Sequence, residues 1–296
     1  MIRFLIAATL FLFAAAVLAQ ENTPEPRPTF RELLFFQDGD ALYSLDTDVP
    51  DAAPVLVAQG AQPISAGVDA LGIGYLLNDV AYMALLEPQM GVALDFSTEP
   101  PAWLRWSTDV YAIAARIGDR FVLADILDQE YSQPAEHSGF AYNVSATPNL
   151  VIISEGQDVR DAVYAPDKFQ VAYIVREGAG EALYLASLLG DAPRLLAESD
   201  SPLLGLSWSS DSTQIIATRE DGALLRVDTL SGEFGVIAGA ACTTAYWSPS
   251  ADEAAYISAE GALFIVPLND PVSARTLASD ARDCLEYPLV WSTDGT

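Results

Sequence analysis

One short pattern recurs along this chain and constrains its fold more than any other feature. An aromatic residue is followed by a polar turn rich in Ser, Pro and Asp, and we call this the aromatic turn motif. It stands at Trp106, Tyr164, Trp208, Trp247 and Trp291, with a degenerate copy near Ile64. A pattern that returns in this way predicts a repeated structural unit rather than one irregular domain.

A second series, of short apolar runs, accompanies the motif. Each run follows a turn that contains Asp, Glu or Gly, and the six runs begin at Asp40, Asp79, Asp119, Glu181, Gly222 and Gly261. The runs start about 40 residues apart, except for one interval of 62 residues between the third and the fourth. One unit therefore carries an insertion of about 20 residues.

Each unit predicts four short β-strands. The apolar runs are too short for helices, β-branched and aromatic residues fill them, and turn residues come every eight to twelve positions. Four strands repeated about every 40 residues are typical of a β-propeller blade. The sequence therefore predicts an all-β fold, a six-bladed β-propeller of four-stranded blades.

The two series are out of phase at the ends of the chain. Strands are expected at residues 33–46 before any aromatic turn motif, whereas the motif at Trp291 has no further strands after it. We expect the N- and C-terminal strands to complete one blade together and to close the ring, which removes exposed sheet edges. The alternative is a chain cut inside a further blade.

The aromatic turn motif is expected to be structural. Its Asp or Ser side chain can accept hydrogen bonds from backbone N–H groups two residues on, and its ring can pack between neighbouring blades. This applies to Trp106, Trp208, Trp247 and Trp291. None of the Asp residues in these motifs is a candidate catalytic residue.

These motifs also resemble the Trp-Ser-Pro-Asp-Gly repeats of TolB-type propellers, which are WD40-like. The resemblance covers residues 33–296 and implies a six-bladed propeller in the cell envelope or outside the cell. TolB carries a further α/β domain before its propeller, and other propellers of this type are joined to peptidase domains. Only a spacer precedes the blades of this chain, so neither specific role follows from the resemblance.

The N-terminus predicts export. Residues 1–19 have the layout of a secretory signal peptide, with Arg3 before an uncharged apolar run and small residues at Val17 and Ala19. An uncleaved N-terminal membrane anchor is the alternative. Residues 20–30 are a Pro-rich spacer, and residues 31–296 form the propeller, with the insertion at about 126–160.

The charge of the chain is strongly negative. Fourteen Lys and Arg residues oppose 41 Asp and Glu residues, a net charge of −27. This charge repels nucleic acid and anionic lipid, so we expect neither as a partner, and it favours a basic partner or divalent cations. We expect a monomer that is not an integral membrane protein once the signal peptide is removed.

The sequence offers little for catalysis. His137 is the one histidine, and no nucleophile motif, phosphate-binding loop or dinucleotide-binding motif is present. We therefore expect no catalytic residue, no cofactor and no metal site. The alternative is a calcium-dependent hydrolase or lyase that uses channel-lining carboxylates, with ligands from the acidic loops at 37–40 and 46–51.

The favoured function is a non-catalytic scaffold that binds a protein or another ligand. Loops on a rigid framework commonly carry recognition, and the insertion is the most distinctive one here. Its candidate contact residues are Tyr131, His137, Phe140 and Tyr142. These aromatic side chains are equally able to pack on the blade beneath them.

Two cysteines occur, Cys242 and Cys284, 42 residues apart. Both precede an aromatic turn motif, so we expect them in the segments that lead into the first strands of two neighbouring blades. In an oxidising compartment they are predicted to form a disulfide. Two buried free thiols are the alternative.

Overall fold

The computed structural model describes residues 33–38, 40–46, 50–60, 62–66, 72–78, 80–85, 90–94, 96, 99–107, 112–125, 142–146, 148–189, 191–279 and 291. The chain divides into two compact units, residues 1–34 with 45–54, and residues 35–44 with 55–296. Apart from two residues at the start of β1 and two at the end of β2, all the strands lie in the second unit. The signal peptide and spacer expected at residues 1–30 lie outside the described residues.

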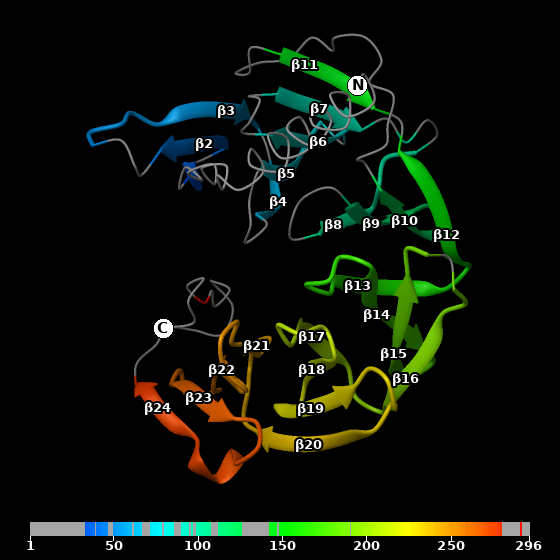
Figure 1. The fold of residues 1–296 in the computed structure, drawn as a ribbon, viewed down its shortest axis with the longest axis vertical. Coiled ribbons are helices and arrows are strands. Elements are labelled where there is room, and N and C mark those ends of the chain that lie inside the picture. The colour runs from blue at the N-terminus through cyan, green and yellow to red at the C-terminus, as the bar shows by residue number, and fades with distance from the viewer. Residues whose placement is uncertain are drawn as a thin grey trace, which may run out of the picture. The chain divides into compact units, whose positions relative to one another are not determined.

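The strands form six sheets, numbered here in chain order (Figure 1). Sheet 1 contains β1 (Leu33–Asp38), β2 (Ala41–Asp46) and β3 (Val55–Gln59). Sheet 2 contains β4 (Gln62–Ala66), β5 (Gly72–Leu77), β6 (Val80–Leu85), β7 (Met90–Leu94) and β11 (Tyr142–Ala146). Sheet 3 contains β8 (Trp103–Trp106), β9 (Ala112–Ile117), β10 (Arg120–Asp125) and β12 (Asn149–Glu155).

The remaining three sheets follow the repeat without interruption. Sheet 4 contains β13 (Asp158–Tyr164), β14 (Gln170–Glu177), β15 (Gly180–Ser187) and β16 (Arg194–Ser199). Sheet 5 contains β17 (Leu203–Trp208), β18 (Gln214–Arg219), β19 (Ala223–Asp228) and β20 (Phe234–Gly239). Sheet 6 contains β21 (Tyr246–Trp247), β22 (Glu253–Ile257), β23 (Leu263–Pro267) and β24 (Arg275–Ala278).

This arrangement confirms the all-β prediction and the repeated unit. Four sheets have four strands, sheet 1 has three, and sheet 2 has five. The described part of the chain contains no α-helix, only a short 3-10 helix at Pro271–Ser273. It therefore holds no helix long and apolar enough to cross a membrane.

The polar residues of the aromatic turn motif hold the turn after the first strand, as expected. The Asp211 carboxylate accepts hydrogen bonds from the Ser209 hydroxyl at 2.7 Å and from the backbone N–H of Thr213 at 3.1 Å. These hydrogen bonds hold the pKa of Asp211 below its usual value. In sheet 3 the Ser107 hydroxyl oxygen accepts the backbone N–H of Ala112 at 2.9 Å. The motif therefore closes the first hairpin of a sheet with its own side chains.

Two aromatic rings of the motif are bonded to the main chain next to the preceding motif. The indole N–H of Trp208 donates to the carbonyl oxygen of Val163 at 3.0 Å, and that of Trp291 donates to the carbonyl oxygen of Tyr246 at 2.9 Å. In both cases the acceptor residue is 45 positions earlier, next to the aromatic residue of the preceding motif. Each of these rings therefore ties its own motif to the first strand of the preceding sheet, β13 for Trp208 and β21 for Trp291.

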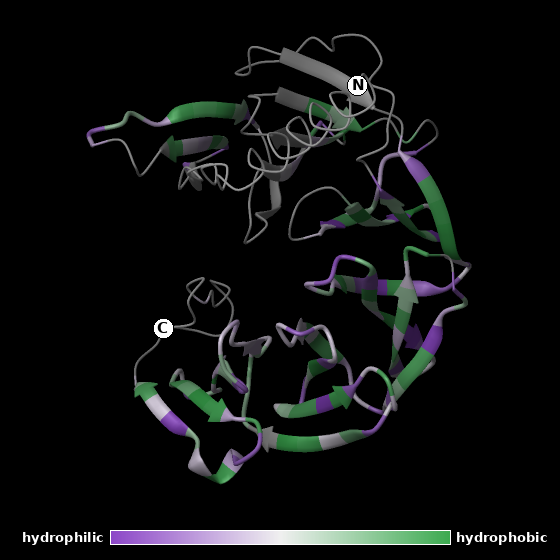
Figure 2. Ribbon diagram, viewed as in Figure 1, coloured by the Kyte–Doolittle hydropathy of each residue, from purple (hydrophilic) through white to green (hydrophobic). Residues whose placement is uncertain are grey.

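The core lies between consecutive sheets. Consecutive residues are buried along inner strands such as β9, β10 and β14, and Figure 2 shows how widely apolar residues occur along the strands. One cluster joins sheets 4 and 5 through residues such as Ile174, Leu183, Leu225 and Val227, all at most 5% exposed. Since both faces of these sheets are covered by neighbours, the runs contain more apolar residues than a half-exposed strand would.

A β-bulge recurs in the last strand of the repeat. One extra residue sits opposite the third strand in sheets 1, 3, 4, 5 and 6. The extra residues are aliphatic: Val57, Ile153, Leu196, Ile237 and Leu277. The first four pack in or against the cluster shared with the following sheet. Leu277, in the last described strand, is instead 56% exposed.

The close contact between sheets 2 and 3 predicts a strong effect at Gly74. A Cβ atom on Gly74 would lie 1.5 Å from Nε1 of Trp106, so Gly74→Val must displace the indole ring. We expect a loss of about 3 kcal/mol in the free energy of unfolding. Gly235→Val, with open space around its added Cβ, is the control and should change this free energy by less than about 0.5 kcal/mol in urea titrations. Equal effects of the two substitutions would contradict this account of the contact.

Ring closure stays a prediction, and the bulge pattern supplies its test. Leu196 shares a cluster with Leu225, which holds the place in its third strand that Tyr43 holds in β2. If sheet 1 follows sheet 6, Leu277 should meet Tyr43. A double-mutant cycle of Leu277→Ala and Tyr43→Ala should then give a coupling energy of about 1 kcal/mol. A cycle of Leu196→Ala and Leu225→Ala is the positive control. If the unfolding free energies are additive for Leu277 and Tyr43 but coupled for Leu196 and Leu225, ring closure is contradicted.

Candidate binding surface

The insertion departs from the repeat by crossing to another sheet. After β10 the chain does not return at once to sheet 3, because β11 pairs with β7 of sheet 2 in a parallel register from Tyr142 opposite Met90 to Ala146 opposite Leu94. The sequence did not predict this fifth strand. Of the four candidate contact residues, the structure places Tyr142 at the start of β11, whereas Tyr131, His137 and Phe140 lie outside the described residues.

Two residues separate β11 from β12, which is the last strand of sheet 3. β12 pairs antiparallel with β10, from Asp125 opposite Asn149 to Arg120 opposite Glu155. Two successive strands therefore pair with different sheets, β11 with sheet 2 and β12 with sheet 3. These main-chain bonds join two neighbouring sheets at their outer edges.

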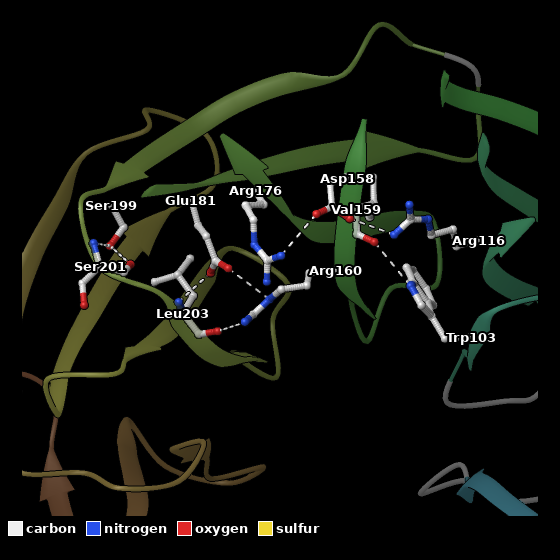
Figure 3. A network of polar contacts seen from close by, with 10 residues as sticks. All are labelled: Trp103, Arg116, Asp158, Val159, Arg160, Arg176, Glu181, Ser199, Ser201 and Leu203. Atoms are coloured by element: carbon white, nitrogen blue, oxygen red, sulfur yellow. Dashed lines mark hydrogen bonds and ion pairs between the residues drawn. The ribbon is translucent and has the colours of Figure 1, made fainter. Parts of the chain in front are cut away.

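An ion pair within sheet 4, between Arg160 of β13 and Glu181 of β15, holds the start of β17 in sheet 5. Arg160 Nε lies 3.1 Å from Glu181 Oε1, and the Glu181 side chain is only 3% exposed. The other carboxylate oxygen of Glu181 accepts the backbone N–H of Leu203 at 2.6 Å, while the Arg160 guanidinium donates to the Leu203 carbonyl oxygen. Figure 3 shows these groups facing one another. Both backbone groups of Leu203 are therefore held by sheet 4.

The same network continues toward sheet 3 through Asp158. Its two carboxylate oxygens face Arg116 at 2.8 Å and Arg176 at 3.5 Å (Figure 3). Nearby, Arg105 of β8 pairs with Asp161 of β13 at 2.9 Å. The carboxylates at the start of β13 are therefore neutralised by arginines from its own sheet and from the preceding one.

Sequence reasoning missed this network. Acidic residues are so numerous that no one of them stands out, but basic residues are scarce, with 14 in the whole chain. Arg105 and Arg160 stand one and four positions before the aromatic residue of a turn motif. A search for basic residues just ahead of these motifs would have identified both.

The described residues contain no group of three or more His, Cys, Asp or Glu side chains that could hold a metal ion. In the two loops considered for calcium, Asp40 accepts a hydrogen bond from the Gln59 side-chain amide at 2.5 Å. Residues 47–49 of the loop at 46–51 lie outside the described residues.

The structure describes Cys242, one of the two cysteines of the predicted disulfide. Cys242 Sγ lies 3.1 Å from the carbonyl oxygen of Ser258, and its backbone N–H donates to the Ile257 carbonyl oxygen at 2.9 Å. This places Cys242 beside the second strand of sheet 6. Cys284 lies outside the described residues, so its pairing with Cys242 stays a prediction.

Thiol titration of the denatured, unreduced protein tests the disulfide. We expect no titratable thiol per chain before reduction and two after it. By the loop-entropy estimate, a bond that closes a loop of this size stabilises the fold by about 4 kcal/mol, so reduction should also lower the melting temperature. Two titratable thiols in the unreduced protein would contradict the pairing.

The ion pair of Arg160 and Glu181, which holds Leu203 of sheet 5, predicts unequal roles for two acidic residues. Glu181→Ala leaves the Arg160 side chain and the Leu203 N–H without their carboxylate, so we expect a loss of about 3 kcal/mol in the free energy of unfolding. Asp200, whose side chain is 90% exposed beside Arg219 at 3.6 Å, is the control. Asp200→Ala should cost less than about 0.5 kcal/mol in urea unfolding. A similar cost at both sites would contradict the role given to Glu181.

Comparison with known proteins supports the fold. No protein-family model and no curated protein matches this sequence. Among solved structures, the chain is similar to a chain of a nidogen–laminin complex, with a TM-score of 0.53 and 12% identity over 84% of this chain and 93% of that one. It is also similar to an oligogalacturonate lyase in complex with manganese, with a TM-score of 0.60 and 12% identity over 81% of this chain and 70% of that one.

A third similar structure is TolB from Acinetobacter baumannii, with a TM-score of 0.51 and 16% identity over 81% of this chain and 60% of TolB. At sequence identities this low, the similarity is evidence for the fold but not for a shared function. The resemblance to TolB-type propellers is therefore confirmed for the fold. This chain has a propeller-type fold built from six β-sheets.

Proposed function

We propose that this chain is an exported, non-catalytic β-propeller that serves as a binding scaffold in the cell envelope or outside the cell. The observation that carries the proposal is the insertion, because it is where the described chain leaves its repeat and adds backbone to another sheet. The similar structures include a chain of a complex between two proteins and TolB. Residues 1–19 support export as a signal peptide.

The partner is a protein with a basic surface. The net charge of −27 favours association with positive charge and opposes nucleic acid and anionic membranes. The arginines near the first strands are already paired with carboxylates in the network around Asp158 and Glu181. They are consequently poor candidates for binding an acidic ligand, because such a ligand would have to break these pairs.

The second candidate function is a metal-dependent lyase or hydrolase. The likeness to an oligogalacturonate lyase in complex with manganese favours it over other reactions. Elemental analysis of the purified chain tests it. Stoichiometric calcium or manganese, together with metal-dependent cleavage of an acidic polysaccharide, would place this function above the scaffold.

Capture from envelope extract tests the scaffold. The immobilised chain should retain a specific protein, and Tyr131→Ser with Phe140→Ser in the insertion should reduce the amount retained at least tenfold. Leu189→Ser with Val272→Ser is the matched control, because these side chains are 77% and 95% exposed elsewhere in the chain. Equal capture by both double variants would exclude the insertion as the binding surface, and no specific capture by the parent chain would count against the scaffold.

A further inference from the structure

Most outer edges of the sheets are shaped against strand addition. In sheets 1, 3, 4, 5 and 6 the last strand carries the aliphatic bulge described above. A bulge interrupts the regular spacing of main-chain donors and acceptors and increases the local twist. Natural proteins use bulges at edges because an interrupted edge is a poor template for a further strand.

Sheet 2 lacks this device. β6 and β7 pair in one unbroken register, from Ala81 opposite Leu94 to Leu85 opposite Met90. On its other side β7 has accepted β11 over its full length, again without a bulge. The regular edge of sheet 2 is therefore able to take up a strand from outside the sheet, and β11 is such a strand.

Among the described strands β11 is the edge strand of sheet 2, and it carries no bulge, charge or Pro. Its sequence, Tyr-Asn-Val-Ser-Ala, contains no charge and no Pro, although charged residues make up 19% of the chain. Its pairing with β7 is regular over all five residues. No described strand pairs with its other side.

We propose that the outer edge of β11 is a strand-addition site for an extended segment of a partner protein that carries basic residues beside the paired stretch. This inference rests on the proposed binding function and specifies how the partner is bound. Main-chain hydrogen bonds supply the affinity in such complexes, and side chains next to the strand supply the selectivity.

The net charge of the chain indicates whether a different protein or a second copy of this chain occupies the edge of β11. Two copies of this chain would bring together net charges of −27 each, which opposes pairing of one β11 with another at moderate ionic strength. A segment with Lys or Arg beside an apolar stretch has the opposite charge. The occupant is therefore a different protein.

A synthetic peptide supplies the probe. It carries the β7 sequence, Met-Gly-Val-Ala-Leu, between pairs of Lys, because this sequence already pairs with β11 on its inner side. We expect the peptide to bind the full chain and to slow amide hydrogen exchange at residues 142–146. A version with Glu in place of Lys should bind about tenfold more weakly at low salt. A version with Pro in place of Val should not bind, because Pro lacks the N–H that a ladder needs.

Two variants locate the site. Val144→Lys and Ser145→Lys place a charge on either face of β11, since successive residues of a strand point to opposite faces. Each should weaken binding of the Lys peptide at least tenfold. Val236→Lys is the control, because Val236 is 67% exposed on the bulged strand β20, and it should leave binding unchanged. Exchange rates without peptide verify that β11 remains paired with β7 in each variant.

Several outcomes would overturn the inference: unchanged binding in both β11 variants, equal binding of the Pro peptide, protection on a strand other than β11, or dimerisation of the free chain through this edge. The proposed function has a separate readout. If an envelope protein is still captured by both β11 variants, the scaffold stands and the strand-addition site is wrong.

Discussion

The contact between an aromatic ring and the preceding sheet is the interaction on which the rest of this structure depends. The indole of Trp208 packs within the cluster between sheets 4 and 5 while its N–H is satisfied by the Val163 carbonyl oxygen. A large ring can be buried there because its one polar atom reaches main chain at a fixed place. Trp291 makes the same bond to Tyr246. In sheets 3 to 6 the motif ring packs in the cluster shared with the preceding sheet, as expected for a repeat protein whose units have no separate core.

Variation at this contact shows how tightly it is packed. Trp106 lies over Gly74, where no side chain would fit, and its N–H has no hydrogen-bond partner within the described residues. At the position that corresponds to Gly74, sheet 4 has Ala172 and sheet 5 has Ile216, both fully buried. The space beneath the ring therefore sets the size of the residue that fits there, and a single substitution at this contact affects two sheets at once.

Polar groups at the starts of the first strands complete this arrangement. An acidic chain would repel itself where carboxylates converge, and four arginines, Arg105, Arg116, Arg160 and Arg176, lie beside the carboxylates of this region. Asp158, Asp161 and Glu181 each face an arginine within 3.1 Å. The rest of the surface keeps its negative charge. Local ion pairs therefore hold the sheets. The remaining negative charge of the surface fits the proposed preference for basic partners.

The sequence by itself determined the repeat. Turn residues, aromatic rings and apolar runs act locally, so the strands, the hairpins and the structural role of Trp208 or Asp211 followed from their spacing. Only the tertiary structure decided what depends on contacts between distant residues. The pairing of β11 with β7 joins residues about 50 positions apart through main-chain groups that every residue possesses, and no side-chain pattern reveals it. The partnership of Arg160 with Glu181 was hidden for a similar reason, because many carboxylates were available and folding selected one of them.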